Sequence, residues 1–277
     1  MLSHVILDPW QYNFFVRALV VGALVGAACG LMGVFVTVRR MSYVGHGLAH
    51  AAFGGAVLAY VSGGDFYLGA GAWVFVSMLL VILMMRQRRI PSDAAVGLVT
   101  TAGFALGVLL LSRLQRVTRN LESALFGYLL GVTDRDVLIV VVCVPLLFLI
   151  VALHYKAFVS TAFDRDAART NGIPILKTDL LYAFLLAGVV VLGMRVLGAT
   201  MLAAALVVPA MTARMLTDRF GRMILLSPLL GAAFAVAGLY LSYFFNVSSG
   251  ASIVLTGIAC FCIVFGCVNK LGRYPEI

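Results

Sequence analysis

The sequence predicts an all-α, polytopic integral membrane protein, and three observations support this class. The 277-residue chain is 63% hydrophobic and 11% charged, with a mean hydropathy of +1.08, whereas soluble domains are about 45–50% apolar and about 25% charged. Its apolar runs reach the length of about 20 residues that a helix needs to cross a bilayer. Its basic residues gather in alternate loops. We expect a single transmembrane domain over residues 1–277, with eight or nine transmembrane helices.

The apolar segments follow one another along the whole chain. We place nine predicted spans at residues 14–37, 43–61, 66–86, 94–112, 136–154, 177–195, 198–217, 222–244 and 249–269. The first is predicted to be retained, because no small-residue cleavage site follows a short apolar region, as it would in a signal peptide. Residues 120–136 are too short to span and are predicted to form an interfacial or re-entrant helix on the outer side.

The net charge of +9 is distributed in a way that predicts topology. Fourteen of the 20 Lys and Arg residues fall on one side of the predicted spans: Arg39, Arg40, Arg86, Arg88, Arg89, Lys156, Arg165, Arg169, Lys177, Arg214, Arg219, Arg222, Lys270 and Arg273. Because positive residues favour the cytoplasmic side, we expect the N-terminus outside and the C-terminus in the cytoplasm. The basic character is therefore interpreted as a topology signal and not as a nucleic-acid footprint.

Regularly spaced glycines and one proline occur within the predicted spans. Glycines recur at intervals of four: Gly22, Gly26 and Gly30 in the first span, and Gly103 and Gly107 in the fourth. Small residues at this spacing let helix backbones approach closely, so we expect packing contacts there. Pro209 interrupts the seventh span and is expected to kink it, as a static bend or as part of a gate.

The sequence leaves few groups that can do chemistry inside the membrane. A phosphate-binding loop needs Gly-Lys followed by Ser or Thr, and no Gly-Lys dipeptide occurs, so any ATP that drives the protein is bound by another polypeptide. All Asp and Glu residues lie in loops or at span ends, whereas ion-coupled secondary transporters usually keep carboxylates at membrane depth. His46 and His50 remain as the ionisable cluster nearest the middle of the membrane.

His46 and His50 lie in the stretch RRMSYVGHGLAHAAFGG, residues 39–55. Because they are four residues apart, they share one face of a helix. Counted from the basic pair at 1.5 Å per residue, His46 lies about 9 Å and His50 about 15 Å into a hydrocarbon core about 30 Å thick. The surrounding glycines and alanines predict a slim helix from which the rings project. Neutral imidazole binds zinc and other borderline metals, so we predict a metal pathway here.

The histidine pair also permits other interpretations. Two ligands do not complete a tetrahedral zinc site, and a symmetric dimer would supply two more. The two rings can instead hydrogen-bond across helices as structural groups, or relay protons in a proton-coupled secondary carrier, since histidine titrates near neutrality. A metalloprotease H-E-x-x-H motif is excluded, because Gly47 follows His46 and the general base is missing.

Three segments resemble the membrane-spanning permeases of bacterial ABC importers that take up zinc and manganese with a periplasmic metal-binding protein. They are GALVGAACGLMGVFVTVRRMSYVGHGLAHAAFGG, ESALFGYLLGV and VLGATMLAAALVVPAMTARMLT. The resemblance runs from about Leu19 to Lys270. It implies a type II ABC-importer-like permease in the bacterial inner (cell) membrane. Such a subunit is not an enzyme, holds no permanent cofactor, forms a homodimer, and works with two ATPase subunits and an extracytoplasmic metal-binding protein.

The resemblance also implies a role for the histidine pair. In this family the metal passes between two permease subunits and is coordinated by an aspartate–histidine pair from each. His50 matches the histidine, but His46 stands where the aspartate is usual. Carboxylate oxygen suits manganese and imidazole nitrogen suits zinc, so zinc is the expected cargo, with manganese or iron as the alternative within the family.

A second match lies in the loop STAFDRDAARTNGIPILKTD, residues 160–179. Residues from about 161 to 172 are predicted to form a short cytoplasmic helix, which Gly172 and Pro174 end. It resembles the family's coupling helix, which docks in a groove of the ATPase. Asp164, Ala168 and Gly172 occupy the matching positions. The alternative is a solvated connecting loop.

Three aspartates are candidates on the outer side. Asp65, Asp134 and Asp136 are expected either to attract cations and contact the receptor protein, or to be ordinary solvated loop charges. Two further functions remain open: a sister permease for siderophores or cobalamin, which would need a wide cavity and no histidine pair, and a membrane subunit with a purely structural role.

Overall fold

The computed structural model describes residues 8–41, 43–86, 90–112 and 129–270, and everything described is helical or connecting loop. The long helices are α2 (Asn13–Val38), α3 (Val44–Val61), α4 (Phe66–Arg86), α5 (Ser92–Ser112), α7 (Asp134–Leu153), α10 (Ile175–Leu197), α11 (Ala199–Leu216), α12 (Phe220–Phe245) and α13 (Ser249–Lys270). The short ones are η1 (Asp8–Gln11), η2 (Leu129–Gly131), α8 (Tyr155–Phe163) and α9 (Arg165–Thr170).

The predicted fold class is confirmed. Within the described residues, eight helices are long and apolar enough to cross a membrane. The remaining predicted span corresponds to α5, whose apolar part, Ala94–Leu110, is shorter than the other spans. Most of the predicted interfacial helix at 120–136 lies outside the described residues, and its described end forms η2 and the start of α7.

Helix α2 lies at the centre of the bundle, where it packs most extensively against α12 and also against α11, α7 and α10. Its glycines allow this packing, as predicted. A Cβ at Gly26 would overlap the carbonyl oxygen of Gly231 in α12, and a Cβ at Gly30 would overlap that of Ser227. The Ser227 hydroxyl donates a hydrogen bond of 2.7 Å to the carbonyl of Gly30. Close backbone approach and an interhelical hydrogen bond therefore hold α2 against α12.

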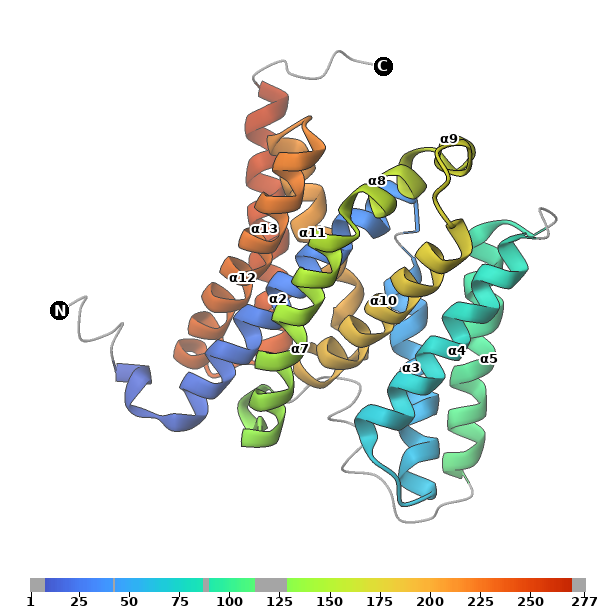
Figure 1. Ribbon diagram of the computed structural model, residues 1–277. Helices are drawn as coiled ribbons and strands as arrows, with labels where there is room; N and C mark the ends of the chain where they lie inside the picture. Colours follow the sequence, from blue (N-terminus) through green and yellow to red (C-terminus); the bar gives the residue numbers. More distant parts are fainter. Residues whose placement is uncertain (1–7, 42, 87–89, 113–128, 271–277) are drawn as a thin grey trace.

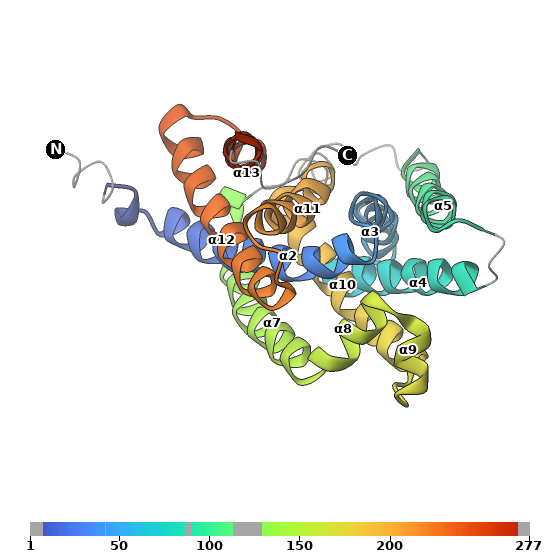
Figure 2. The same ribbon diagram turned by 90° about the horizontal axis from the view of Figure 1, so that it is seen from above.

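Helices α3, α4 and α5 form a second group beside this centre (Figure 1). Gly103 and Gly107 of α5 both pack against Gly54 of α3, which confirms the packing role predicted for this pair. Seen from above, α13, α11, α3 and α5 follow one another along one face of the molecule, and α7 and α8 lie on the opposite face (Figure 2). This arrangement places α3, the helix with the two histidines, on the same face as α5, α11 and α13.

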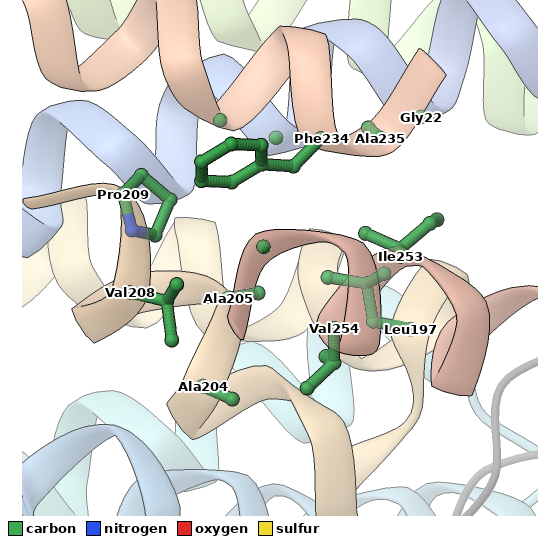
Figure 3. Close-up of a pocket in the computed structure, with 13 residues that line it drawn as sticks. Gly22, Leu197, Ala204, Ala205, Val208, Pro209, Phe234, Ala235, Ile253 and Val254 are labelled. Carbon is green, nitrogen blue, oxygen red and sulfur yellow. The ribbon is translucent and has the colours of Figure 1, made fainter. Parts of the chain in front are cut away.

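Pro209 lies inside α11 with helix on both sides of it, and the kink expected there stays a prediction. The residue is buried. It lines an apolar cavity of about 20 Å³ together with residues such as Gly22, Phe234 and Ile253, at the meeting of α2, α11, α12 and α13 (Figure 3). A cavity of this size accommodates about one water molecule. Pro145 in α7 and Pro228 in α12 also lie inside helices. A gating role for Pro209 stays a prediction.

Candidate metal site and coupling helix

His46 and His50 share one face of α3, as their spacing predicts. Their Nε2 atoms lie 3.2 Å apart, and the ring centroids are 4.5 Å apart with an interplanar angle of 83°. Phe104 of α5 packs edge-on against His50 at 5.1 Å, and Tyr43 lies 5.5 Å from His46. Both histidines are half-buried. The two Nε2 atoms therefore lie at hydrogen-bonding distance from each other, and an aromatic side chain packs beside each ring.

The glycines of α3 serve close helix packing, and a pathway along the rings stays a prediction. A Cβ at Gly45 would lie 2.7 Å from Leu206 of α11, and a Cβ at Gly47 would lie 2.8 Å from Thr100 of α5. Because these glycines precede and follow His46 by one residue, they lie on either side of it around the helix. The histidine face is thus the part of α3 that lies between α5 and α11.

The depth estimated for the pair from the sequence assumed a helix that continues from the basic pair at residues 39 and 40. Arg40 adopts a left-handed backbone conformation with φ 55°, and helix α3 begins only at Val44. The chain does not rise 1.5 Å per residue through this turn. His50 is the seventh of 18 residues in α3, which places it about 9 Å along the helix axis from the first residue. It therefore lies in the N-terminal half of the helix, and its depth relative to the midplane stays a prediction.

The geometry of the pair suits half of a metal site. Two nitrogens bound to one tetrahedral zinc ion, at the usual length of about 2.0–2.1 Å, lie about 3.3 Å from each other, close to the 3.2 Å found here. Among the residues that the structure describes, no group of three or more His, Cys, Asp or Glu side chains could hold a metal. The described residues of one chain therefore do not form a complete metal site around the pair.

The predicted coupling segment forms two helices rather than one. Thr161 belongs to α8, and Asp164, with extended backbone, ends α8 and begins α9. The Asp164 carboxylate accepts hydrogen bonds of 2.9 and 3.0 Å from the backbone N–H groups of Asp166 and Ala167, which caps α9. The expected single helix from 161 is therefore wrong at its start, because this capping side chain breaks it.

The C-terminal end of α9 lies just before Gly172, as predicted. Gly172 has φ +74° and donates to the carbonyl of Arg169, while the N–H of Ile173 donates to the carbonyl of Ala168. These two bonds make a Schellman motif, in which glycine supplies the left-handed residue. Ala168, a residue of α9, is fully buried. The segment is thus a short helix capped at both ends, at the end of the molecule where α8 and the last turn of α13 also lie (Figure 1).

The three aspartates predicted to lie on the outer side each have partners within the chain. Asp134 pairs with Arg17 at 2.8 Å and is 81% exposed. Asp65 pairs with Arg135 at 2.5 Å. Burial acts to raise the pKa of the Asp65 carboxyl, but hydrogen bonds from Arg135 and from two backbone N–H groups outweigh it and hold the pKa below its usual value. Contact of these aspartates with a cation or a receptor stays a prediction.

Asp136 differs from the other two because it is buried. It completes a capping box with Thr133 at the start of α7 and accepts a hydrogen bond from the hydroxyl of Tyr67. Asp136 therefore caps the start of α7 and connects α7 to α4 by a hydrogen bond.

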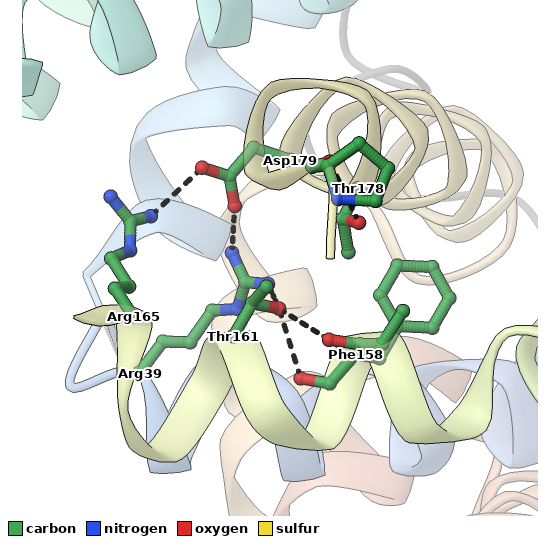
Figure 4. A network of polar contacts seen from close by, with 8 residues as sticks. Arg39, Phe158, Thr161, Arg165, Thr178 and Asp179 are labelled. Atoms are coloured by element: carbon green, nitrogen blue, oxygen red, sulfur yellow. Dashed lines mark hydrogen bonds and ion pairs between the residues drawn. The ribbon is translucent and has the colours of Figure 1, made fainter. Parts of the chain in front are cut away.

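The sequence interpretation missed one cluster of charged residues. Arg39, treated above only as a marker of the cytoplasmic surface, is buried and pairs with Asp179 of α10 at 2.9 Å (Figure 4). The sequence did hold a sign of this pair, because the two residues have opposite charge and lie near the ends of predicted spans on the same side of the membrane. Nothing in the linear pattern shows that these two span ends meet.

The fold and the site together define a multi-pass helical membrane protein with a capped helical segment at one end and a pair of metal-type ligands on one face. The profile of the ABC 3 transport family matches residues 11–268. The chain therefore belongs to the ABC 3 transport family, and the resemblance found in its sequence is confirmed.

Several named relatives align with nearly the whole chain. It is 34% identical over 262 residues to the manganese transport system membrane protein MntC of Listeria monocytogenes, with 95% of this chain and 93% of the relative covered. It is 32% identical to the manganese import system permease protein ScaB of Streptococcus gordonii, with 96% and 95% covered. It is also 32% identical to the chelated iron transport system membrane protein YfeC of Yersinia pestis, with 91% and 86% covered.

Two solved structures share the fold. PsaBC from Streptococcus pneumoniae in complex with Fab matches with a TM-score of 0.86 and 32% identity, over 96% of this chain and 95% of that chain. An inward-facing conformation of a putative metal-chelate type ABC transporter matches with a TM-score of 0.71 and 17% identity, over 91% and 85%. The second match shows the fold alone.

Proposed function

We propose that this chain is the transmembrane subunit of an ABC importer that moves a divalent transition metal into the cytoplasm. The observation that carries the proposal is the pair of imidazole nitrogens, 3.2 Å apart, on the face of α3 between α5 and α11. Membership of the ABC 3 transport family and relatives named for manganese and iron transport support it. The chain itself hydrolyses nothing, and a separate ATPase supplies the energy.

The proposed pathway runs between two copies of the chain. Each copy supplies His46 and His50, so four nitrogens surround one ion, as a tetrahedral site requires. The face of α3, α5, α11 and α13 is the one that meets the second copy (Figure 2). An extracytoplasmic metal-binding protein delivers the ion, which rests on the four rings and then leaves inward. Binding must be strong enough to accept the ion and weak enough to release it.

The proposed orientation has the N-terminus outside and the C-terminus in the cytoplasm. The basic residues of the described loops support it, because positive side chains favour the cytoplasmic side. An aromatic group at the opposite end of the bundle also fits a membrane–water boundary. There the indole N–H of Trp10 donates to the hydroxyl of Tyr240 at 2.7 Å, and Tyr12 and Phe14 are exposed beside it. The inner membrane is then the location, with α8 and α9 inside the cell.

The proposed docking element for each of the two ATPase subunits is α9 with its two caps. Asp164 begins it, the buried Ala168 ties it to the bundle and Gly172 ends it. An element that transmits force has to keep its shape, and two caps hold this six-residue helix in one conformation. The preceding α8 continues from α7, and α9 lies beyond the ends of α10, α4 and α5 on that side (Figure 1).

Zinc is the proposed cargo on the chemistry of the donor atoms, because imidazole nitrogen suits zinc. Manganese is the second candidate, and the names of the relatives favour it. The ratio of zinc to manganese uptake in proteoliposomes that contain the permease, its ATPase and its receptor separates the two. We expect zinc to be preferred by the natural chain, and His46→Asp to move the preference toward manganese, since it replaces a nitrogen donor by oxygen.

The same vesicles test the broader proposal. Uptake that needs no ATP would contradict an ABC importer and would support the proton-coupled carrier. An unchanged metal preference in His46→Asp would show that residue 46 does not contact the ion.

A further inference from the structure

A single buried carboxylate joins the proposed docking helix to the centre of the bundle. Asp179 of α10 accepts a hydrogen bond of 2.9 Å from Nη1 of Arg39 through Oδ1, and one of 3.1 Å from Nη2 of Arg165 through Oδ2 (Figure 4). The side chains of Asp179 and Arg39 are only 5% and 6% exposed, whereas Arg165 is 46% exposed. One oxygen therefore holds a fixed partner, and the other holds a partner that solvent or another protein can reach.

Arg39 has further contacts that fix its position. Its Nη2 donates to the hydroxyl of Thr161 in α8 at 3.0 Å, and its guanidinium lies 4.2 Å from the ring centroid of Tyr182 in α10. A hydrogen bond, an ion pair and a cation–π contact hold one planar group from three directions. Arg39 is thus the rigid end of the cluster.

The place of Arg39 in the chain links the cluster to the histidines. It is the C-terminal cap of α2, and the left-handed turn at Arg40 follows it directly. Helix α3 then begins at Val44, and His46 is seven residues after Arg39. A displacement of Arg39 therefore moves the turn from which α3 starts, and with it the base of the histidine face.

We propose that Arg165, Asp179 and Arg39 form a charge link that transmits movement of α9 to the junction of α2 and α3. This inference rests on the proposed function, in which α9 docks on the ATPase. Arg165 is the input, because it belongs to α9 and is half-exposed. Asp179 is shared between the two arginines, and Arg39 passes the displacement to the start of α3. All three are positioning residues, and none of them touches the metal.

The test is a double-mutant cycle in the complete importer, reconstituted with its ATPase and its metal-loaded receptor. The quantity measured is the stimulation of ATP hydrolysis by the loaded receptor over the basal rate. We expect Arg165→Gln to lower this stimulation about threefold, in the range of coupling between contacting residues, while the ATPase still copurifies. Lys177→Gln is the matched control, because it removes an exposed positive charge two residues from Asp179 and is expected to leave the stimulation unchanged.

The second arm of the cycle uses Asp179→Asn. If the link is real, this variant lowers the stimulation by itself, and adding Arg165→Gln lowers it no further. If the double variant lost stimulation by the product of the two single losses, the link would be overturned, because Arg165 would then act through another partner. Loss of ATPase copurification in Arg165→Gln would overturn it too, since Arg165 would be a docking residue, although the docking role of α9 would stand.

A third variant is kept for the case in which Asp179→Asn does not assemble, because it leaves the charge of Arg39 buried without a counter-ion. Arg165→Lys retains a positive charge that can reach the same carboxylate oxygen, and a single hydrogen bond does not need the fork of a guanidinium. We expect it to restore the stimulation lost in Arg165→Gln. Stimulation that stays low in Arg165→Lys would overturn the proposal.

Discussion

Replacing either His46 or His50 by alanine is expected to abolish metal uptake. Each substitution removes one nitrogen from every chain, and a symmetric pair of chains then keeps two of its four proposed ligands. Loss even of a supporting contact at a metal site typically costs about 10–100-fold, so the loss of a ligand should lower uptake by more than about tenfold. Uptake of radioactive zinc into reconstituted vesicles measures this directly.

The matched control for this prediction is His154→Ala. His154 is exposed at the end of α7, where its ring contacts the backbone carbonyl of Ile150 and the ring of Phe158, and it lies outside the proposed metal site. We expect normal uptake in that variant, and normal assembly of all three variants with the ATPase. Uptake within twofold of the natural chain in both His46→Ala and His50→Ala would show that the ion passes elsewhere.

Replacing Gly172 by valine is expected to uncouple ATP hydrolysis from transport. The residue adopts φ +74°, a conformation that costs an L-residue about 1–2 kcal/mol and more for a β-branched one. No atom lies within 4 Å of a Cβ built there, so the effect comes from the backbone and not from a collision. A cost of this size lowers the population of a correctly ended α9 by about 5–30-fold. The ratio of metal transported to ATP hydrolysed is the measurement.

The conservative variant Gly172→Asn separates backbone conformation from other causes. Asparagine tolerates the left-handed conformation and is found at helix ends of this kind, so we expect it to keep most of the coupling. Equal losses in the valine and asparagine variants would show that the Schellman motif is not what matters at this position. Full coupling in both would show that α9 is not the docking element.

The sequence predicted the spans well because hydropathy and length are local properties. The bounds of α4, Phe66–Arg86, coincide with the predicted span. Four-residue spacing also placed His46 and His50 on one face, because a continuous helix fixes that relation. The glycine repeat of α2 predicted close packing, although only the structure shows that α12 is the partner.

What the sequence could not show depends on contacts between distant segments. Arg39 and Asp179 are 140 residues apart, and their pairing follows from the way α2 and α10 meet. The break at Asp164 was missed because an aspartate fits within a helix as well as at its start, and only the hydrogen bonds made by its carboxylate distinguish the two cases. The left-handed turn at Arg40 was not foreseen either, because no pattern in the sequence marks it.

The measurement closest to the proposed site is zinc K-edge X-ray absorption on the purified, zinc-loaded permease, together with its zinc-to-protein ratio. We expect one zinc for every two chains, with four nitrogen neighbours at about 2.0–2.1 Å, and the loss of that signal in His50→Ala. One zinc per single chain, or a shell of oxygen or sulfur neighbours that persists in His50→Ala, would mean that the histidines of two chains do not share the ion.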